Sequence, residues 1–534
     1  MCLVNKLFNR AAYSYKNKHQ RFTFGDTANE KVKKTQAIIK DLLNDPTKSS
    51  ILDAIRTISI EVHEIKDWNR NKASTNYSGW DDLVDLLIRL PYLKALTVAG
   101  DGQIPKIVFE TIEHYHKTAY LDILDWCRLE DGQDHNNPDE IALAKSPNLR
   151  SIQARLWNTN ADYDLRFAAL KRIVTMAPNI QDVDISQGSS GCVVRGYSME
   201  QLQEERRRAA LFDVEASPKS IKSLKSEGGS FVDSLGIAVD CTKLESLDID
   251  YIPDEDFFTR DCLPNSRFPN LKHFSTSIDL YNRDAIKLAV LKLAVSGYIA
   301  SAKPLQTLSL KNWRKDIPLS TILSAHGKTV QTLALHETEN INEPQGLLSL
   351  TELDQIAQCC PFLEDLTLDV GDRGLDHMLA MISALAKLPK LSVLRIYIPL
   401  GIAGEAAQTS WGLLEKEKSS LDVGSHKRNP LSPLDDACWL ENFWSILRTE
   451  KLRYRTPALQ EFHVKIGEWE SKMGQGFPAP WVIWESSNRR YLIAKPSERD
   501  DRPDELSVQE MKSIPYGKLG SVETKVIPQI VTGI

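Results

Sequence analysis

The chain has 534 residues, of which 42% are hydrophobic and 26% are charged. This composition is typical of a folded globular protein and excludes a wholly disordered one. Its formal net charge of −6 is small for the length. This balance argues against a dedicated nucleic-acid binder, which would carry a basic excess. Because no run of about 18 apolar residues occurs, neither a transmembrane helix nor a membrane partner is expected.

The eight cysteines are scattered along the chain. None forms a C-x-x-C pair, so neither a zinc site nor a redox motif is indicated. Cys359 and Cys360 stand at the expected end of a helix, just before Pro361, and we interpret them as two small buried thiols. Free cysteines indicate a reducing compartment, so the sequence predicts a cytoplasmic or nuclear protein.

A pattern of apolar residues, L-x-x-L-x-L, recurs along the chain. Alternate side chains of a strand point to opposite faces, so the two closing apolar positions face the same side. Most copies start roughly 25 to 40 residues apart, as expected when each strand is followed by a full helix. In chain order the copies begin at Ile55, Leu93, Leu121, Leu149, Ile180, Leu244, Leu271, Leu305, Val330, Leu363, Leu391 and Leu459.

Prolines mark the corners between the expected helices and strands, because proline cannot continue a helix. They stand just before the strand patterns at Pro147, Pro178, Pro269, Pro304, Pro361, Pro389 and Pro457. Segments upstream of the strand patterns, such as residues 80–90, carry apolar residues at helical spacing. The sequence therefore predicts an α/β fold: an irregular, horseshoe-like leucine-rich-repeat solenoid of strand-plus-helix repeats. The alternative, a doubly wound α/β domain, would need glycine-rich turns after its strands, and we find none.

Two intervals between copies are too long for a single repeat. We expect insertions near residues 187–220 and 400–455, within a solenoid that covers residues 25–466. The first insertion opens with the glycine- and serine-rich residues 187–191, but the lysine of a phosphate loop does not follow, so a turn is favoured. A helix is expected from about Ser198. Its surface pairs Glu204 with Arg208, a spacing that favours a solvated face over a nucleic-acid patch.

The chain changes character after Ile466. Residues 478–484 and 490–494 both read as strands, separated by a turn at residues 486–488. A hairpin of this kind would cap the open end of the solenoid. We therefore assign residues 467–534 to a C-terminal capping hairpin and a tail.

The side chains between the core positions of each strand should form the concave binding face. In the middle of the series this face is acidic, and toward the C-terminus it becomes basic and aromatic. The candidate partner-binding residues are Asp182, Asp184, Asp248, Asp250, Asp365, Asp369, Arg395 and Tyr397, with His463 and Lys465 beyond them. Such a face would attract a basic segment of a protein partner. The alternative is that the aspartates only keep an exposed sheet soluble.

The sequence carries none of the motifs G-x-S-x-G or H-E-x-x-H, and no histidine has a partner at metal-ligand spacing. We therefore expect a non-enzymatic protein with no catalytic, metal or cofactor site, and with no nucleic-acid partner.

Residues 3–11, followed by Arg21-Phe22-Thr23-Phe24, resemble the last helix of an F-box and the strand after it. Together with the repeats and the late segment 497–501, they resemble filamentous-fungal F-box and leucine-rich-repeat proteins. In that family the F-box binds a Skp-type adaptor of a cullin ubiquitin ligase, and the repeats select the substrate. The earlier F-box helices have no counterpart, so residues 1–24 are assigned to the remnant of an F-box.

The resemblance implies the substrate-selecting subunit of an SCF-type (Skp–cullin–F-box) ubiquitin ligase, with a protein substrate and a Skp-type adaptor as partners. The adaptor-facing residues would be Leu3, Val4, Leu7 and Phe8. The same four side chains can also be read as an amphipathic cap on the first repeat. The alternative function is a free-standing leucine-rich-repeat scaffold that no longer docks to a ligase.

Overall fold

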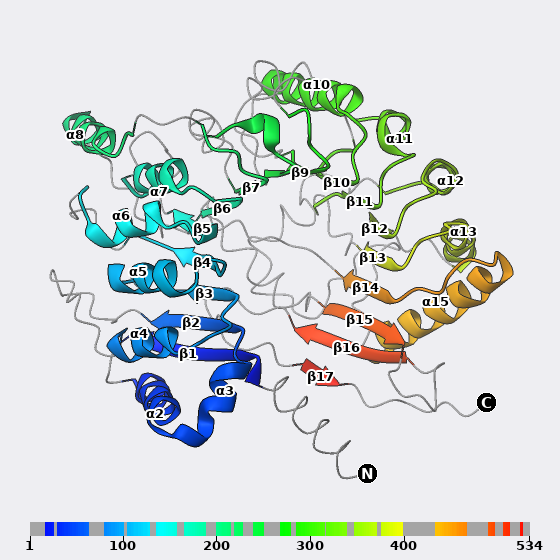
Figure 1. Ribbon diagram of the computed structural model, residues 1–534. Coiled ribbons are helices and arrows are strands. Elements are labelled where there is room, and N and C mark those ends of the chain that lie inside the picture. Colours follow the sequence, from blue (N-terminus) through cyan, green and yellow to red (C-terminus); the bar gives the residue numbers. More distant parts are fainter. Residues whose placement is uncertain are drawn as a thin grey trace, which may run out of the picture. The chain divides into compact units, whose positions relative to one another are not determined.

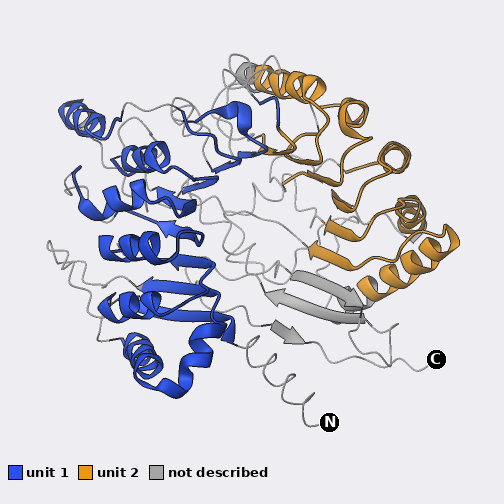
Figure 2. Ribbon diagram, in the orientation of Figure 1, with its two compact units in different colours: residues 1–253, 268–270 blue, residues 254–267, 271–534 orange. Residues whose placement is uncertain are grey.

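The computed structural model describes residues 17–25, 29–63, 80–100, 104–128, 135–156, 165–187, 199–214, 218–227, 239–249, 268–278, 285–314, 317–338, 347–370, 375–398, 433–466, 490–496, 506–512 and 524–526. The chain forms two compact units, coloured separately in Figure 2. Unit 1 comprises residues 1–253 and 268–270, and unit 2 comprises residues 254–267 and 271–534.

Unit 1 alternates strands with helices (Figure 1). Its described strands pair in parallel, each with the next along the chain. The strands are β1 (His19–Gly25), β2 (Thr57–His63), β3 (Ala95–Ala99), β4 (Tyr120–Trp126), β5 (Leu149–Leu156), β6 (Asp182–Gln187), β7 (Ser223–Ser226) and β8 (Ser246–Ile249). The helices are α2 (Glu30–Asn44), η1 (Pro46–Lys48), α3 (Ser49–Ala54), α4 (Trp80–Ile88), α5 (Lys106–Tyr115), α6 (Pro138–Lys145), α7 (Leu165–Met176), α8 (Met199–Ala210) and η2 (Cys241–Lys243).

Unit 2 repeats the same alternation and then reverses direction. Strands β9 (His273–Ser277), β10 (Thr307–Lys311), β11 (Thr332–His336), β12 (Asp365–Asp369), β13 (Val393–Ile398) and β14 (Glu461–Ile466) are parallel neighbours. Helices α10 (Ala285–Ser301), α11 (Leu319–His326), α12 (Leu350–Cys359), α13 (Leu375–Ala386) and α15 (Pro433–Arg453) separate them. Strands β15 (Arg490–Pro496), β16 (Leu506–Lys512) and β17 (Thr524–Val526) then add antiparallel pairs beyond β14.

The alternation of buried and half-buried side chains explains the repeat. Leu96 and Val98 of β3 are buried against the helices, whereas Thr97 between them is half-buried on the other face. Leu308 and Leu310 of β10 follow the same rule. Each fully buried leucine contributes about 1.5–3 kcal/mol through the apolar area that it removes from water. Both units are therefore strand-plus-helix solenoids of the leucine-rich-repeat type, as the sequence predicts.

One glycine has a conformation that the fold requires. Gly100 follows β3 with a φ of +114°, and a Cβ built there would lie 2.1 Å from the carbonyl oxygen of Val62. The chain can therefore pass this close to the neighbouring strand only with glycine.

Two expectations need correction. The copy that begins at Leu121 has a different phase, because Ile123 is buried whereas Leu124 is 36% exposed. Its strand carries two register shifts against β5. Cys360 is buried, but Cys359 is exposed, so the two thiols do not share one environment. Burial raises the pKa of Cys360 to about 12.

Several assigned segments meet the described residues only in part. Residues 21–24 lie within β1, which pairs with β2 as a strand of the unit 1 sheet. The helix expected in the first insertion is α8, and Glu204 binds Arg207 at 2.9 Å, while Arg208 also lowers the pKa of Glu204. In the C-terminal segment β15 pairs with β14 and β16. The proposed strand at 478–484, the remnant at residues 3–11 and Asp250 lie outside the described residues.

Candidate recognition surface

In each unit the helices cover one face of the sheet (Figure 1), and the side chains that alternate with the core lie on the other face, the open face. These are the positions where the sequence predicts a binding surface. Because the strands are parallel and in register, the open face presents one side chain per strand in rows. Neighbouring members of a row lie about 4.8 Å apart.

The aspartates predicted on the open face of unit 1 have basic neighbours. Oδ2 of Asp182 lies 4.0 Å from Nε of Arg150, and Oδ2 of Asp184 lies 3.8 Å from Nζ of Lys225. Lys225 is also in register with Asp248 on β8. Opposite charges therefore alternate along this row, so the open face of unit 1 is not uniformly acidic.

The environment of Asp182 combines opposing effects. Burial raises the pKa of its carboxyl above the ordinary value, and Arg150 opposes this shift. Asp122 on β4 raises the pKa further, while Lys222 lowers it. Asp122 in turn accepts a hydrogen bond of 2.6 Å from Oγ of Ser151. A partner that brings a cation to this position would therefore relieve the repulsion between the two carboxylates.

On the open face of unit 2, Asp365 is bound by Arg395. The two residues lie on adjacent strands, β12 and β13, and Nη1 of the arginine donates to Oδ1 of the aspartate. The neighbouring strand β14 carries His463, whose Nε2 lies 2.9 Å from Oε2 of Glu461. The two predicted residues Asp365 and Arg395 thus meet directly and neutralise one another.

A second row crosses unit 2 from β10 to β14 through Lys311, His336, Asp369, Tyr397 and Lys465. Nδ1 of His336 lies 2.6 Å from Oδ1 of Asp369, and both side chains are almost fully buried. The ring of Tyr397 lies 4.1 Å from that of His336, and Nζ of Lys465 lies 5.2 Å from the centre of the tyrosine ring. Asp369 therefore acts on this surface by orienting His336, because its own carboxylate is removed from solvent.

A second carboxyl group adjoins this row at the end of β11. Oε1 of Glu337 accepts a hydrogen bond of 2.7 Å from the amide of Arg314, and its own amide donates to Oδ2 of Asp369 at 2.6 Å. Burial raises the pKa of Glu337 to about 7, with Asp369 adding to the shift and the amide of Arg314 opposing it. The charge beside His336 and Asp369 therefore changes near neutral pH.

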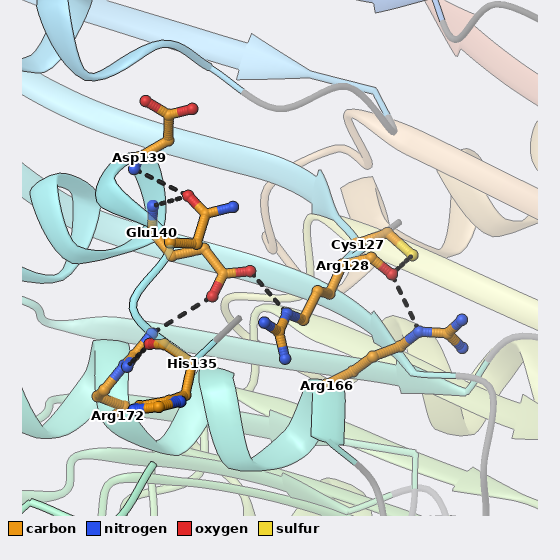
Figure 3. A network of polar contacts seen from close by, with 8 residues as sticks. Cys127, Arg128, His135, Asp139, Glu140, Arg166 and Arg172 are labelled. Atoms are coloured by element: carbon orange, nitrogen blue, oxygen red, sulfur yellow. Dashed lines mark hydrogen bonds and ion pairs between the residues drawn. The ribbon is translucent and has the colours of Figure 1, made fainter. Parts of the chain in front are cut away.

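A buried ionic network lies in unit 1, away from the predicted residues (Figure 3). The carboxylate of Glu140 binds Nε of Arg128 at 2.9 Å and Nη2 of Arg172 at 3.3 Å. All three side chains are less than 10% exposed. Phe212, just after α8, lies 4.7 Å from each guanidinium. Burial raises the pKa of Glu140 and the two arginines oppose that shift. The ion pairs join α6 and α7 to Arg128 after β4, and the ring of Phe212 links both guanidiniums to the residues that follow α8.

A small cavity adjoins the network. Its lining includes Gly100, Trp126, Cys127 and Asp139 together with Glu140, and its volume is about 30 Å³. This is about the space of one water molecule. Small-molecule sites have volumes of roughly 300–1,000 Å³, so the cavity is too small for a substrate.

Within the described residues, no group of three or more His, Cys, Asp or Glu side chains is placed to hold a metal ion. The described helices also include none that combines the length and the apolar character needed to cross a membrane. The predicted adaptor-facing residues Leu3, Val4, Leu7 and Phe8 lie outside the described part of the chain.

The sequence identified the aspartates but missed most of their partners. Lys225 directly follows Leu224 of Ile221-x-x-Leu224, a degenerate form of the repeat pattern in the long interval between Ile180 and Leu244. Aligning this segment with its neighbours would have placed Lys225 beside Asp184. Glu140 and Arg172 carry no comparable signal. They are separated by a repeat, and nothing in their spacing tells a buried pair from an exposed one.

No protein-family model matches the sequence, and no curated protein matches it either. Among solved structures, a chain in the crystal structure of the Rad7 and Elc1 complex in yeast is similar, with a TM-score of 0.32 and 12% sequence identity. The similarity covers 67% of this chain and 73% of that chain.

Proposed function

We propose that this chain is a non-enzymatic protein-recognition solenoid and that it selects substrates for an SCF-type ubiquitin ligase. The observation that carries the recognition role is the row from β10 to β14, in which Lys311, Tyr397 and Lys465 are half-exposed on successive strands and the ring of Tyr397 lies against the buried His336–Asp369 pair. Solenoids use broad surfaces of this kind to bind macromolecules.

The ion pairs of the open face define how a partner would bind. Asp184 lies close to Lys225, and Asp365 is bound by Arg395, so a basic segment must displace internal cations to reach the carboxylates. Half-exposed pairs contribute only about 0–1 kcal/mol each, so this exchange costs little. Specificity then comes from the match between the partner's charges and the alternating row.

A labelled decalysine peptide tests recognition at the open face. Asp248→Lys should weaken its binding, because the reversal removes a carboxylate and places a second lysine beside Lys225. Asp213→Lys is the matched control, since Asp213 is an exposed aspartate just after α8 that pairs with Lys171. Fluorescence anisotropy measures both affinities, and equal losses in the two variants would contradict a role for the open face.

The ligase role rests on the resemblance of residues 3–11 to an F-box helix. Co-purification of the full chain with a Skp-type adaptor is the direct test. Leu7→Asp/Phe8→Asp should abolish capture of the adaptor, whereas Asn5→Asp/Asn9→Asp, which adds the same charge at polar positions, should retain it. If the unmodified chain captures no adaptor, the free-standing scaffold replaces the ligase subunit as the function.

A further inference from the structure

A further row, separate from the rows of the open face, is formed by the residues at the N-terminal ends of successive strands. In each repeat the amide of this residue donates to the carbonyl oxygen of its counterpart one strand earlier, over 2.7–2.9 Å. The pattern breaks once, between β4 and β5, where the strands shift register. In unit 1 this strand-start row consists of Lys18, Arg56, Lys94, Tyr120, Arg150, Gln181, Lys222 and Glu245.

The row is basic in unit 1 but not in unit 2. The same chain of backbone hydrogen bonds in unit 2 joins Lys272, Gln306, Gln331, Glu364, Ser392 and Gln460. Because the second row satisfies the same backbone geometry with largely neutral side chains, the fold does not require cations at these positions. The basic residues of unit 1 need a different explanation.

Two exposed tyrosines organise the arginines of this row. The guanidinium of Arg56 lies 4.8 Å from the ring centre of Tyr92, and that of Arg150 lies 4.7 Å from the ring centre of Tyr120. The tyrosines are 57% and 49% exposed. Stacking holds each planar guanidinium flat on a ring. Nη1 of Arg56 already donates to the carbonyl oxygens of Asp53 and Ile55, so its remaining N–H groups are the donors for a carboxylate.

The surroundings add more positive than negative charge. Lys94 and Lys222 are exposed, and Lys117, in the turn that leads into β4, is exposed as well. On the acidic side, Asp182 lies 4.0 Å from Arg150, and Glu245 ends the row. The net charge of the row and its surroundings is therefore positive. The result is a basic strip along the N-terminal ends of the unit 1 strands, in a chain whose net charge is negative.

We propose that the strand-start row of unit 1 binds an extended acidic segment of a partner protein that lies across the strands. At about 4.8 Å per strand, the distance from Lys18 to Lys222 is roughly 29 Å. An extended peptide of about nine residues has this length. Its carboxylates can accept charge-assisted hydrogen bonds from the stacked arginines and approach the lysines between them.

A peptide fits this row better than a nucleic acid does. Gln181 interrupts the row and Glu245 closes it, so a backbone with a phosphate at every step would meet neutral and repulsive positions. One face of each tyrosine ring is already covered by its own arginine, which leaves less ring surface for a base to stack on. A peptide, in contrast, can carry acidic residues opposite the cations of the row and neutral residues elsewhere.

The strand-start row shares no residue with the predicted adaptor-facing positions, so the proposal stands whether or not the chain joins a ligase. The probe is a fluorescein-labelled decaglutamate peptide, titrated with the full chain and followed by anisotropy. The test variant is Arg56→Gln/Lys94→Gln/Lys222→Gln. The control, Lys303→Gln/Lys328→Gln/Lys390→Gln, removes three exposed charges from unit 2. Thermal denaturation checks that both variants remain folded.

The test variant should bind decaglutamate about tenfold more weakly, as expected for the loss of three exposed charge contacts, and the control should bind like the unmodified chain. Affinity should also fall steeply as salt rises from about 50 to about 300 mM. Equal weakening in the two variants, or no binding of decaglutamate at low salt, would overturn the proposal. Tighter binding of decathymidylate than of decaglutamate would replace the acidic peptide by a nucleic acid.

Discussion

Glu140 is the only anion in the described contacts that binds both Arg128 and Arg172, and all three groups are buried. Replacing one partner of a buried ionic network leaves the opposite charges uncompensated, which costs about 3–5 kcal/mol. Glu140→Gln should therefore lower the urea midpoint of unfolding strongly. Glu110→Gln, which removes an exposed carboxylate paired with Lys106 on α5, should cost under about 0.5 kcal/mol. Similar midpoints for the two variants would show that the network contributes little.

Glu337 gives the chain a pH dependence of defined sign. Its folded pKa is raised from 4.5 to about 7, so the folded state binds a proton that the unfolded chain releases. The stability that comes from this proton is complete below about pH 4.5 and is lost as the pH rises through 7. At about 1.4 kcal/mol per pH unit, the loss between pH 5 and pH 8 is roughly 2–3 kcal/mol.

Glu337→Gln removes this titration and retains an acceptor for the amide of Arg314. The difference in unfolding free energy between this variant and the unmodified chain should grow by that amount from pH 5 to pH 8. Glu364→Gln, at an exposed carboxylate of the same unit, should show a nearly constant difference. Denaturant titrations at a series of pH values provide the measurement. A flat difference for Glu337→Gln would mean that its carboxyl titrates alike in both states.

At the scale of elements, α8 depends on Phe212, two residues beyond its last residue. The helix itself is polar, and the side chains of its first residue, Met199, and of Leu211 just after it are more than half exposed. Phe212, in contrast, is 4% exposed and packs with Leu165 and Ala169 of α7. Within the described residues, Phe212 thus anchors the C-terminal end of α8 to α7.

Phe212→Ala should release α8, because deletion of a buried phenylalanine costs about 3–5 kcal/mol. Hydrogen exchange of residues 199–214 should become fast, while the amides of β5 and β6 keep their protection. Leu211→Ala removes a side chain that is 55% exposed and should leave the exchange unchanged. Slow exchange of α8 in Phe212→Ala would show that other contacts hold the helix.

The strands and helices were predictable because their signals are local and repeated. Leu96 and Val98 show the period of two of a strand, and Pro147 or Pro361 marks the corner between a helix and the next strand. Each element can therefore be predicted from a few neighbouring residues. The phase of β4 was missed, since a residue in the left-handed conformation, Asp125 with φ 58°, accompanies a register shift there. Nothing in Leu121-x-x-Leu124 reveals that shift.

The candidate surfaces were less predictable, for a physical reason. The sequence shows that Asp182 and Asp365 lie on strands, but the charge of a surface depends on which side chains stand on the adjacent strands. Arg395 lies a full repeat away from Asp365, so only the register tells that the two meet.

At the scale of the whole molecule, the described strands pair only with adjacent strands within each unit. The free energy of folding is therefore approximately a sum of contributions from single repeats and from the interfaces between neighbouring repeats. The antiparallel strands β15–β17 cover the edge of β14. A chain truncated after Ile466 should expose that edge and aggregate with increasing concentration. A chain truncated after Val526 retains every described strand and serves as the control. Light scattering compares them, and a monodisperse solution of the shorter chain would exclude a protective role for these strands.

The register shift between β4 and β5 has a consequence for any ligand that follows the strand starts of unit 1. Before the shift Leu121 faces Leu149, and after it Asp122 faces Ser151, so Arg150 is an additional residue in its strand. A straight path along the edge is thereby displaced by one residue, about 3.3 Å. The strand-start row of unit 1 therefore consists of two straight segments, one before and one after the register shift, displaced from each other by one residue. A bound segment would have to carry a flexible or bent residue between its two acidic halves, and the spacing of those halves becomes a criterion by which partners can be told apart.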